Sequence, residues 1–146
     1  MALADHLWRE PARRNRTKDV DFRIVLPLGA TGAIAAGAST PGVTITKVGA
    51  EAGRYLVQFI DSKGNAIVLP SVLSLCFGGV TVQTAAADAA YTAAKATSAN
   101  VRNNTVSTTG SFQIQMIRTD TFADAEAEDN AVLHISFSAK FSSVTP

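Results

Sequence analysis

The sequence has one cysteine, two histidines and one tryptophan, and only 17% of its residues are charged. With Cys76 alone, an intramolecular disulfide is impossible. Neither His6 nor His134 has a second histidine, a cysteine or an acid at the spacing of a metal site. The chain contains no Gly-x-Ser-x-Gly elbow, no phosphate-binding glycine loop and no Cys-x-x-Cys pair. We therefore expect no catalytic residue, no metal ion and no cofactor, and a protein that is not an enzyme.

Long hydrophobic runs are also missing. The most apolar low-complexity stretch, LGATGAIAAGAST (28–40), is short and interrupted by glycines, so it cannot span a bilayer. The opening MALADHLWREP carries an acid and a histidine early and lacks the layout of a secretory signal. These features predict a protein that does not contact membranes and is made and kept in a cytoplasm-like compartment. Cys76 stands among leucines and Phe77, which predicts a buried thiol that acts as a small hydrophobe.

The large apolar residues are concentrated in short runs that alternate with polar residues. AVLHISFSAKF (131–141) is the clearest run, because its apolar residues all fall on one face of a strand, whereas a helix would spread them around its whole surface. Further strands are expected at 20–26, 43–48, 53–61, 66–83 (one or two strands, with a bulge at Gly78-Gly79), 101–110 and 111–119. Residues 85–100 are compatible with either a short helix or a long surface loop.

These runs predict an all-β fold, either an antiparallel β-sandwich or a jelly-roll-like barrel with an extended N-terminal arm. A parallel sheet would need helical crossovers, which the sequence does not offer. We expect two parts in the chain. Residues 1–42 would form the N-terminal arm and linker with one β-strand, and residues 43–146 would form the β-sandwich domain.

Basic side chains gather in the stretch WREPARRNRTKDVDF (8–22). Pro11 and the run of like charges disfavour a long helix. Acids within and around the stretch dilute its positive field, so no specific nucleic-acid binding is expected. A protein surface suits the segment better, because arginine pairs with carboxylates and an exposed tryptophan is a common anchor. The candidate partner-binding residues are Trp8, Arg9, Arg13, Arg14 and Arg16, although Trp8 could instead fold back onto its own domain.

An acidic stretch, DTFADAEAED (120–129), carries five acids and no base. Two interpretations are open. It could pair with the basic arm of a neighbouring subunit, or it could be a solvated loop that keeps the protein soluble. Calcium binding is disfavoured, because the stretch lacks the glycine-hinged order of an EF-hand loop.

Two stretches carry a resemblance to a known class of proteins. They are GRYLVQFID (53–61) and the block VRNNTVSTTGSFQIQMIRTDTFADAEAEDNAVLHISFSAKFSSV (101–144). The block is similar to small virion proteins of tailed bacteriophages, in which a V-R-N…G-S-F…I/V-Q strand, a loop rich in Ala and Asp and a final L-H-I-S-F strand close the domain. The resemblance covers about residues 43–144 and consists of a pattern of strands rather than an active-site motif.

The resemblance implies an accessory structural protein of the virion, and no functional residue is transferred by it. Capsid decoration (cement) proteins of such phages are often β-rich and trimeric, and an N-terminal arm commonly ties them to the major capsid protein. We therefore expect a non-enzymatic decoration protein on the capsid surface, assembled in the host cytoplasm. Its expected partners are the major capsid protein or other virion proteins and copies of itself. The alternatives are a tail, neck or baseplate component, or a carbohydrate-binding module.

Overall fold

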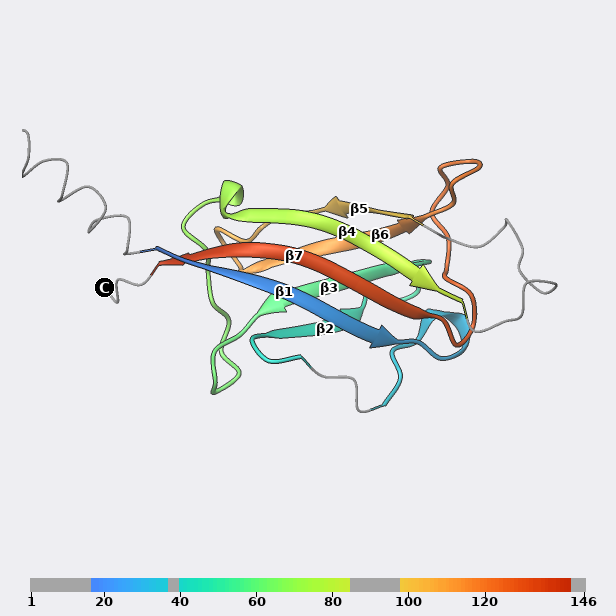
Figure 1. Cartoon of the computed structure of the whole chain (residues 1–146), viewed down its shortest axis with the longest axis horizontal. Coiled ribbons are helices and arrows are strands. Elements are labelled where there is room, and N and C mark those ends of the chain that lie inside the picture. The colour runs from blue at the N-terminus through green and yellow to red at the C-terminus, as the bar shows by residue number, and fades with distance from the viewer. Residues whose placement is uncertain (1–16, 37–39, 85–97, 143–146) are drawn as a thin grey trace, which may run out of the picture.

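The computed structural model describes residues 17–36, 40–84 and 98–142, which form two antiparallel sheets packed face to face (Figure 1). The three-stranded sheet has the order β1-β7-β4 and contains β1 (Thr17–Pro27), β7 (Val132–Ser142) and β4 (Leu75–Gln83). The four-stranded sheet has the order β2-β3-β6-β5 and contains β2 (Val43–Lys47), β3 (Arg54–Phe59), β6 (Ser111–Ile117) and β5 (Ser98–Arg102). The predicted all-β sandwich is confirmed.

The described residues contain no α-helix, only the short 3-10 turns η1 (Ala30–Gly32) and η2 (Val72–Ser74). Of the stretch 85–100, for which a helix and a loop were both open, residues 85–97 lie outside the described residues and residues 98–100 belong to β5. Most of the expected arm also lies outside the described residues, since β1 already begins at Thr17.

β1 is an integral strand of the sandwich rather than part of an arm. It pairs with β7 over its whole length, from Thr17 opposite Ser142 to Pro27 opposite Val132. Its residues Phe22, Ile24 and Leu26 are buried in the core. The division expected at residue 43 therefore does not separate an arm from the sandwich, because the strand before it supplies one edge of a sheet.

Alternation along the strands decides which side chains reach the core. In β7, Leu133, Ile135, Phe137 and Ala139 are buried while His134 faces outward, as predicted. In β4, the register shifts between Phe77 and Gly79, so the expected bulge at the paired glycines is present. The prediction of a buried Cys76 is wrong. It is exposed because its neighbours Leu75 and Phe77 take the inward positions of β4.

A cluster of aromatic rings joins the two sheets at the centre of the core. Phe22 and Phe137 come from the three-stranded sheet and stack with their centroids 4.9 Å apart. Phe59 and Phe112 come from the four-stranded sheet and meet the ring of Phe137 edge-on at 5.9 and 5.1 Å. Edge-to-face rings add specific contacts to the burial of apolar area, so this cluster fixes how the sheets pack.

The strand directions give the sandwich two distinct ends. At one end, which we call the arm end, β1 begins, β7 finishes and η2 leads into β4 (Figure 1). At the other, which we call the loop end, Pro27 lies opposite Val132 and the acidic stretch 120–129 connects β6 to β7. These two ends carry different side chains.

Candidate functional site

The five predicted partner-binding residues, Trp8, Arg9, Arg13, Arg14 and Arg16, lie outside the described residues. The structure does show where the segment that carries these residues joins the sandwich. Thr17 is the first residue of β1 and lies opposite Ser142, near the end of β7. The basic segment therefore joins the body at the arm end.

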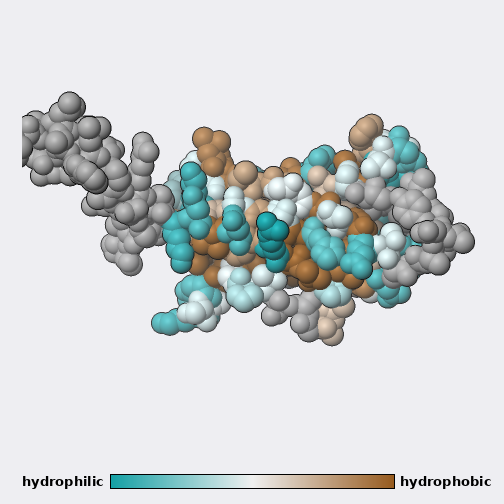
Figure 2. Space-filling view, viewed as in Figure 1, coloured by the Kyte–Doolittle hydropathy of each residue, from teal (hydrophilic) through white to brown (hydrophobic). Residues whose placement is uncertain are grey.

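An apolar projection stands at the same end. Leu73 is 88% exposed and Val72 is 44% exposed, both on η2, and we call these two residues the apolar knob. Figure 2 shows it as a brown projection above the body, at the place of η2 in Figure 1. One residue after η2, Leu75 lies opposite Ala139, only three residues before the end of β7. The knob and the entry of the basic segment thus share one end of the molecule.

Hydrogen bonds hold the knob in a fixed shape. The Ser71 hydroxyl accepts from the Leu73 amide at 3.1 Å, and the Asn104 side-chain amide donates to the Val72 carbonyl at 3.2 Å. Leu69, buried in the core just before the turn, donates its amide to the Val106 carbonyl at 2.8 Å. An exposed leucine on a braced turn needs little ordering on contact with a partner, which favours binding.

At the loop end, three of the five acids of stretch 120–129 pair with bases of their own domain. Asp124 lies 3.2 Å from Arg102 and 3.9 Å from Arg54. Arg118 and Asp120 pair at 2.6 Å, and that contact lowers the pKa of the Asp120 carboxyl. Ala125 donates its amide to the Met116 carbonyl at 3.2 Å, so the stretch is fastened to the end of β6.

A second set of contacts ties the stretch to η1 and β2. Glu126 pairs with the Lys47 ammonium group, which also donates to the Thr31 carbonyl. The Tyr55 hydroxyl donates to the Gly32 carbonyl at 2.7 Å. Burial, and then the nearby charge of Glu126, raise the pKa of Tyr55 well above its usual range, so the hydroxyl stays protonated.

Both interpretations of the acidic stretch stay predictions. The structure adds that Asp124 and Glu126 have basic partners within the same chain. The stretch also lies at the opposite end from Thr17, where the basic segment enters. The basic partners are each the first or last residue of a strand: Lys47, Arg54 and Arg102. This position is the one sequence signal that could have suggested the pairing.

Metal-ligating side chains do not gather in the part of the chain that the structure describes. No three side chains of His, Cys, Asp or Glu come together there in a way that could hold a metal ion. His134 shares a 2.8 Å hydrogen bond with Gln83 on the outer face of the three-stranded sheet. None of the helices in the described ranges has the length and apolarity to cross a membrane.

Comparison of the chain with protein-family models, with curated proteins and with solved structures found no match. The candidate site therefore rests on geometry alone. It consists of the apolar knob and, at the same end of the sandwich, the point where the basic segment joins β1.

Proposed function

We propose that this protein is a non-enzymatic structural component of a tailed-phage virion, a decoration protein that binds the major capsid protein through its N-terminal segment. The single observation that carries the proposal is the placement of Thr17 and the apolar knob at one end of a braced sandwich. The resemblance in residues 53–61 and 101–144 supplies the virion setting.

The two features at the arm end suit one partner surface. The basic segment would contact carboxylates with its arginines and anchor Trp8 in an apolar site, while Leu73 enters a shallow pocket nearby. Two tethered contacts bind at high effective concentration even where each is weak. Many such clamps on an icosahedral shell would resist internal pressure, and the sandwich serves as the rigid base that holds both contacts.

Removing residues 2–16 is expected to reduce occupancy on capsids by about tenfold or more, because one tryptophan or arginine hot spot alone is worth about 2 kcal/mol. This deletion spares β1, which begins at Thr17. Binding is measured by co-sedimentation with capsids assembled from the major capsid protein of the same genome. Circular dichroism and thermal melting confirm that the sandwich is retained.

Unchanged occupancy of the shortened protein would contradict the proposal. Copy number in virions separates the two virion locations. A number near that of the major capsid protein fits decoration, whereas a few copies per particle would instead assign the protein to the tail, neck or baseplate.

Replacing Leu73 with serine is expected to lower capsid occupancy several-fold without changing stability, because the side chain is 88% exposed and supports no core packing. Val68→Ser is the matched control. Val68 is a half-exposed aliphatic residue that, like Leu73, belongs to the segment before β4, but it precedes η2. Equal occupancy of the Leu73→Ser protein and the unchanged protein would remove the knob from the binding surface.

A further inference from the structure

β1 is the one long, regular free edge among the strands that the structure describes. The other edges are β2 and β5, with five residues each, and β4, whose register is broken by the bulge between Phe77 and Gly79. β1 has eleven residues and pairs with β7 along its length with no register shift. On its other side only the last residue is engaged, where the Pro27 carbonyl accepts from the Ala35 amide at 3.0 Å. Short or bulged edges resist pairing with another strand, whereas a long regular edge invites it.

The hydrogen-bonding groups on this edge can be assigned from the register. Leu28 donates its amide to the Ala131 carbonyl at 2.9 Å, which continues the β1–β7 ladder. Because amide direction alternates along a strand, even-numbered residues of β1 direct their backbone groups to β7 and odd-numbered residues direct theirs to the free edge. Pro27, which has no N–H, falls on the free-edge side, as expected for proline in an edge strand.

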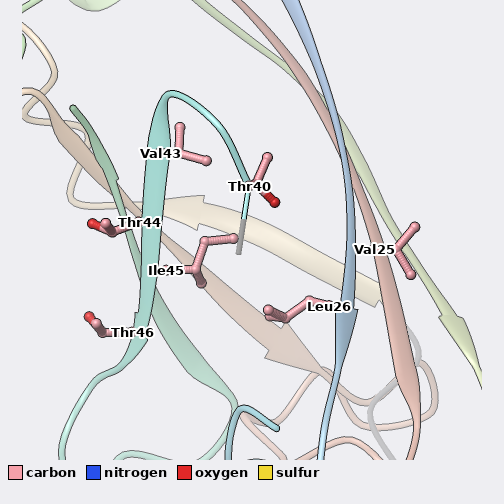
Figure 3. Close-up of a pocket in the computed structure, with 7 residues that line it drawn as sticks. All are labelled: Val25, Leu26, Thr40, Val43, Thr44, Ile45 and Thr46. Carbon is pink, nitrogen blue, oxygen red and sulfur yellow. The ribbon is translucent and has the colours of Figure 1, made fainter. Parts of the chain in front are cut away.

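An apolar groove opens beside the same edge. β4 and β5 lie against each other along one side of the sandwich, but on the other side a cavity of about 270 Å³ separates β1 from β2. Figure 3 shows Leu26 and Ile45 extending toward one another across this groove, while Val25 points away from it. Val25 is 59% exposed. The edge therefore combines unpaired backbone groups with one exposed apolar side chain, that of Val25.

We propose that this edge binds a second copy of the chain, with the two β1 strands antiparallel about a two-fold axis at Phe22. The two sheets then join into one six-stranded sheet. Phe22 is the middle residue of β1, so this register centres the contact on the strand and overlaps residues 18–26 of the two copies. It leaves out Pro27, whose carbonyl is already bonded to the Ala35 amide. Residues 19, 21, 23 and 25 carry the free backbone groups, and they fall opposite 25, 23, 21 and 19, which gives reciprocal hydrogen bonds.

The outward-facing charges of β1 select this register. It places Asp21 of each copy opposite Arg23 of the other, which makes two attractive pairs. Side chains that face each other must lie on the same side of the sheet, so every alternative two-fold register places its axis at another residue of β1. Neighbouring registers therefore differ by one residue in the position of the axis. An axis at Arg23 puts two arginines opposite each other, and an axis at Val20 pairs Asp19 with Asp21. An axis at Asp21 also makes two attractive pairs, between Arg23 and Asp19, but it sets Asp21 against its own mate and is therefore less favourable than the axis at Phe22. An axis at Ile24 leaves Arg23 opposite Val25 with no ion pair.

The same register matches the inward side. It sets Phe22 against its own symmetry mate and Val20 against Ile24, so apolar residues meet at the centre of the core face, and Lys18 falls opposite Leu26 at either end. Pairing here also covers the mouth of the groove in each copy. The resulting contact is isologous, so it closes after two subunits rather than propagating.

A charge swap on the purified full-length protein tests this assignment without any capsid, so its result is independent of the proposed virion role. Within one subunit, Asp21 lies opposite Ser138 and Arg23 opposite Ser136, so reversing either charge creates no like-charge pair directly across from β7. Asp21→Arg and Arg23→Asp are each expected to raise the dissociation constant of the dimer about tenfold or more, because each turns two attractive pairs into repulsive ones. The combined variant restores opposite charges and is expected to regain most of the affinity.

Sedimentation velocity over a concentration series measures the dimer, and thermal melting confirms that each variant is folded. Lys63→Glu is the matched control, since it reverses one charge in an exposed turn and is expected to leave the dimer intact. A monomer or a trimer of the unchanged protein would overturn the proposal. So would a combined variant that dimerises no better than the two single variants.

Discussion

Replacing Phe59 with alanine is expected to lower the free energy of unfolding by about 3–5 kcal/mol, the range for removal of a fully buried phenylalanine. The Phe59 side chain has no exposure to solvent. Its ring contacts Phe22 and Phe137 of the opposite sheet with centroids 5.6 and 5.9 Å away, and Phe141 lies edge-on at 5.5 Å. Truncation would leave a cavity between the sheets that the rigid strands cannot close.

Urea unfolding, followed by far-ultraviolet circular dichroism, measures the change in the free energy of unfolding. A domain of this size has about 5–15 kcal/mol of stability in total, so the variant should be marginal at room temperature. Leu73→Ala is the control, because it removes a similar apolar group from an exposed position and should change stability by less than about 0.5 kcal/mol. A loss below about 1 kcal/mol at Phe59 would contradict the aromatic cluster as the contact between the sheets.

The strands and the core that contains Phe59 could be predicted from sequence because they depend on local alternation. In β3, Tyr55, Val57 and Phe59 are buried as expected for one face of a strand, and β7 follows the same rule. The phase of the alternation was harder to predict around Cys76. The run VLSLCF is apolar at both odd and even positions, and η2 takes up Val72–Ser74 before β4 begins at Leu75. Periodicity alone does not reveal where such a turn ends.

Contacts between distant segments could not be read from the sequence. Glu126 and its partner Lys47 are 79 residues apart, and nothing local distinguishes a paired acid from a solvated one. The exposure of the knob could not be predicted from the sequence for a similar reason. Leu73 resembles a core residue in sequence, and only its position on η2 makes it 88% exposed. The edge position of β1 likewise depends on which strands pair, and pairing between strands far apart in the chain is set by the whole fold.

Replacing Gly53 with alanine is expected to destabilise the loop end strongly, by about 3 kcal/mol or more, from backbone strain together with a steric clash. Gly53 has φ +63°, and a Cβ there would lie 2.1 Å from the Ala125 carbonyl oxygen and 2.8 Å from the Met116 side chain. The Gly53 carbonyl also accepts from the Met116 amide at 2.8 Å, so the backbone cannot move away without losing a buried hydrogen bond. Urea unfolding measures the loss.

Gly49→Ala separates the two causes, because Gly49 lies in the same β2–β3 turn with φ +48° but has no atom within 4 Å of an added Cβ. It should lose only about 1 kcal/mol, the cost of placing a side chain in the left-handed region. Equal losses at Gly49 and Gly53 would mean that stretch 120–129 does not pack on the turn as described. Because the clash lies at the loop end and we propose that capsid binding uses the arm end, folded Gly53→Ala protein at low temperature should keep its capsid occupancy. Reduced capsid occupancy of the folded Gly53→Ala protein would show that the acidic stretch takes part in binding.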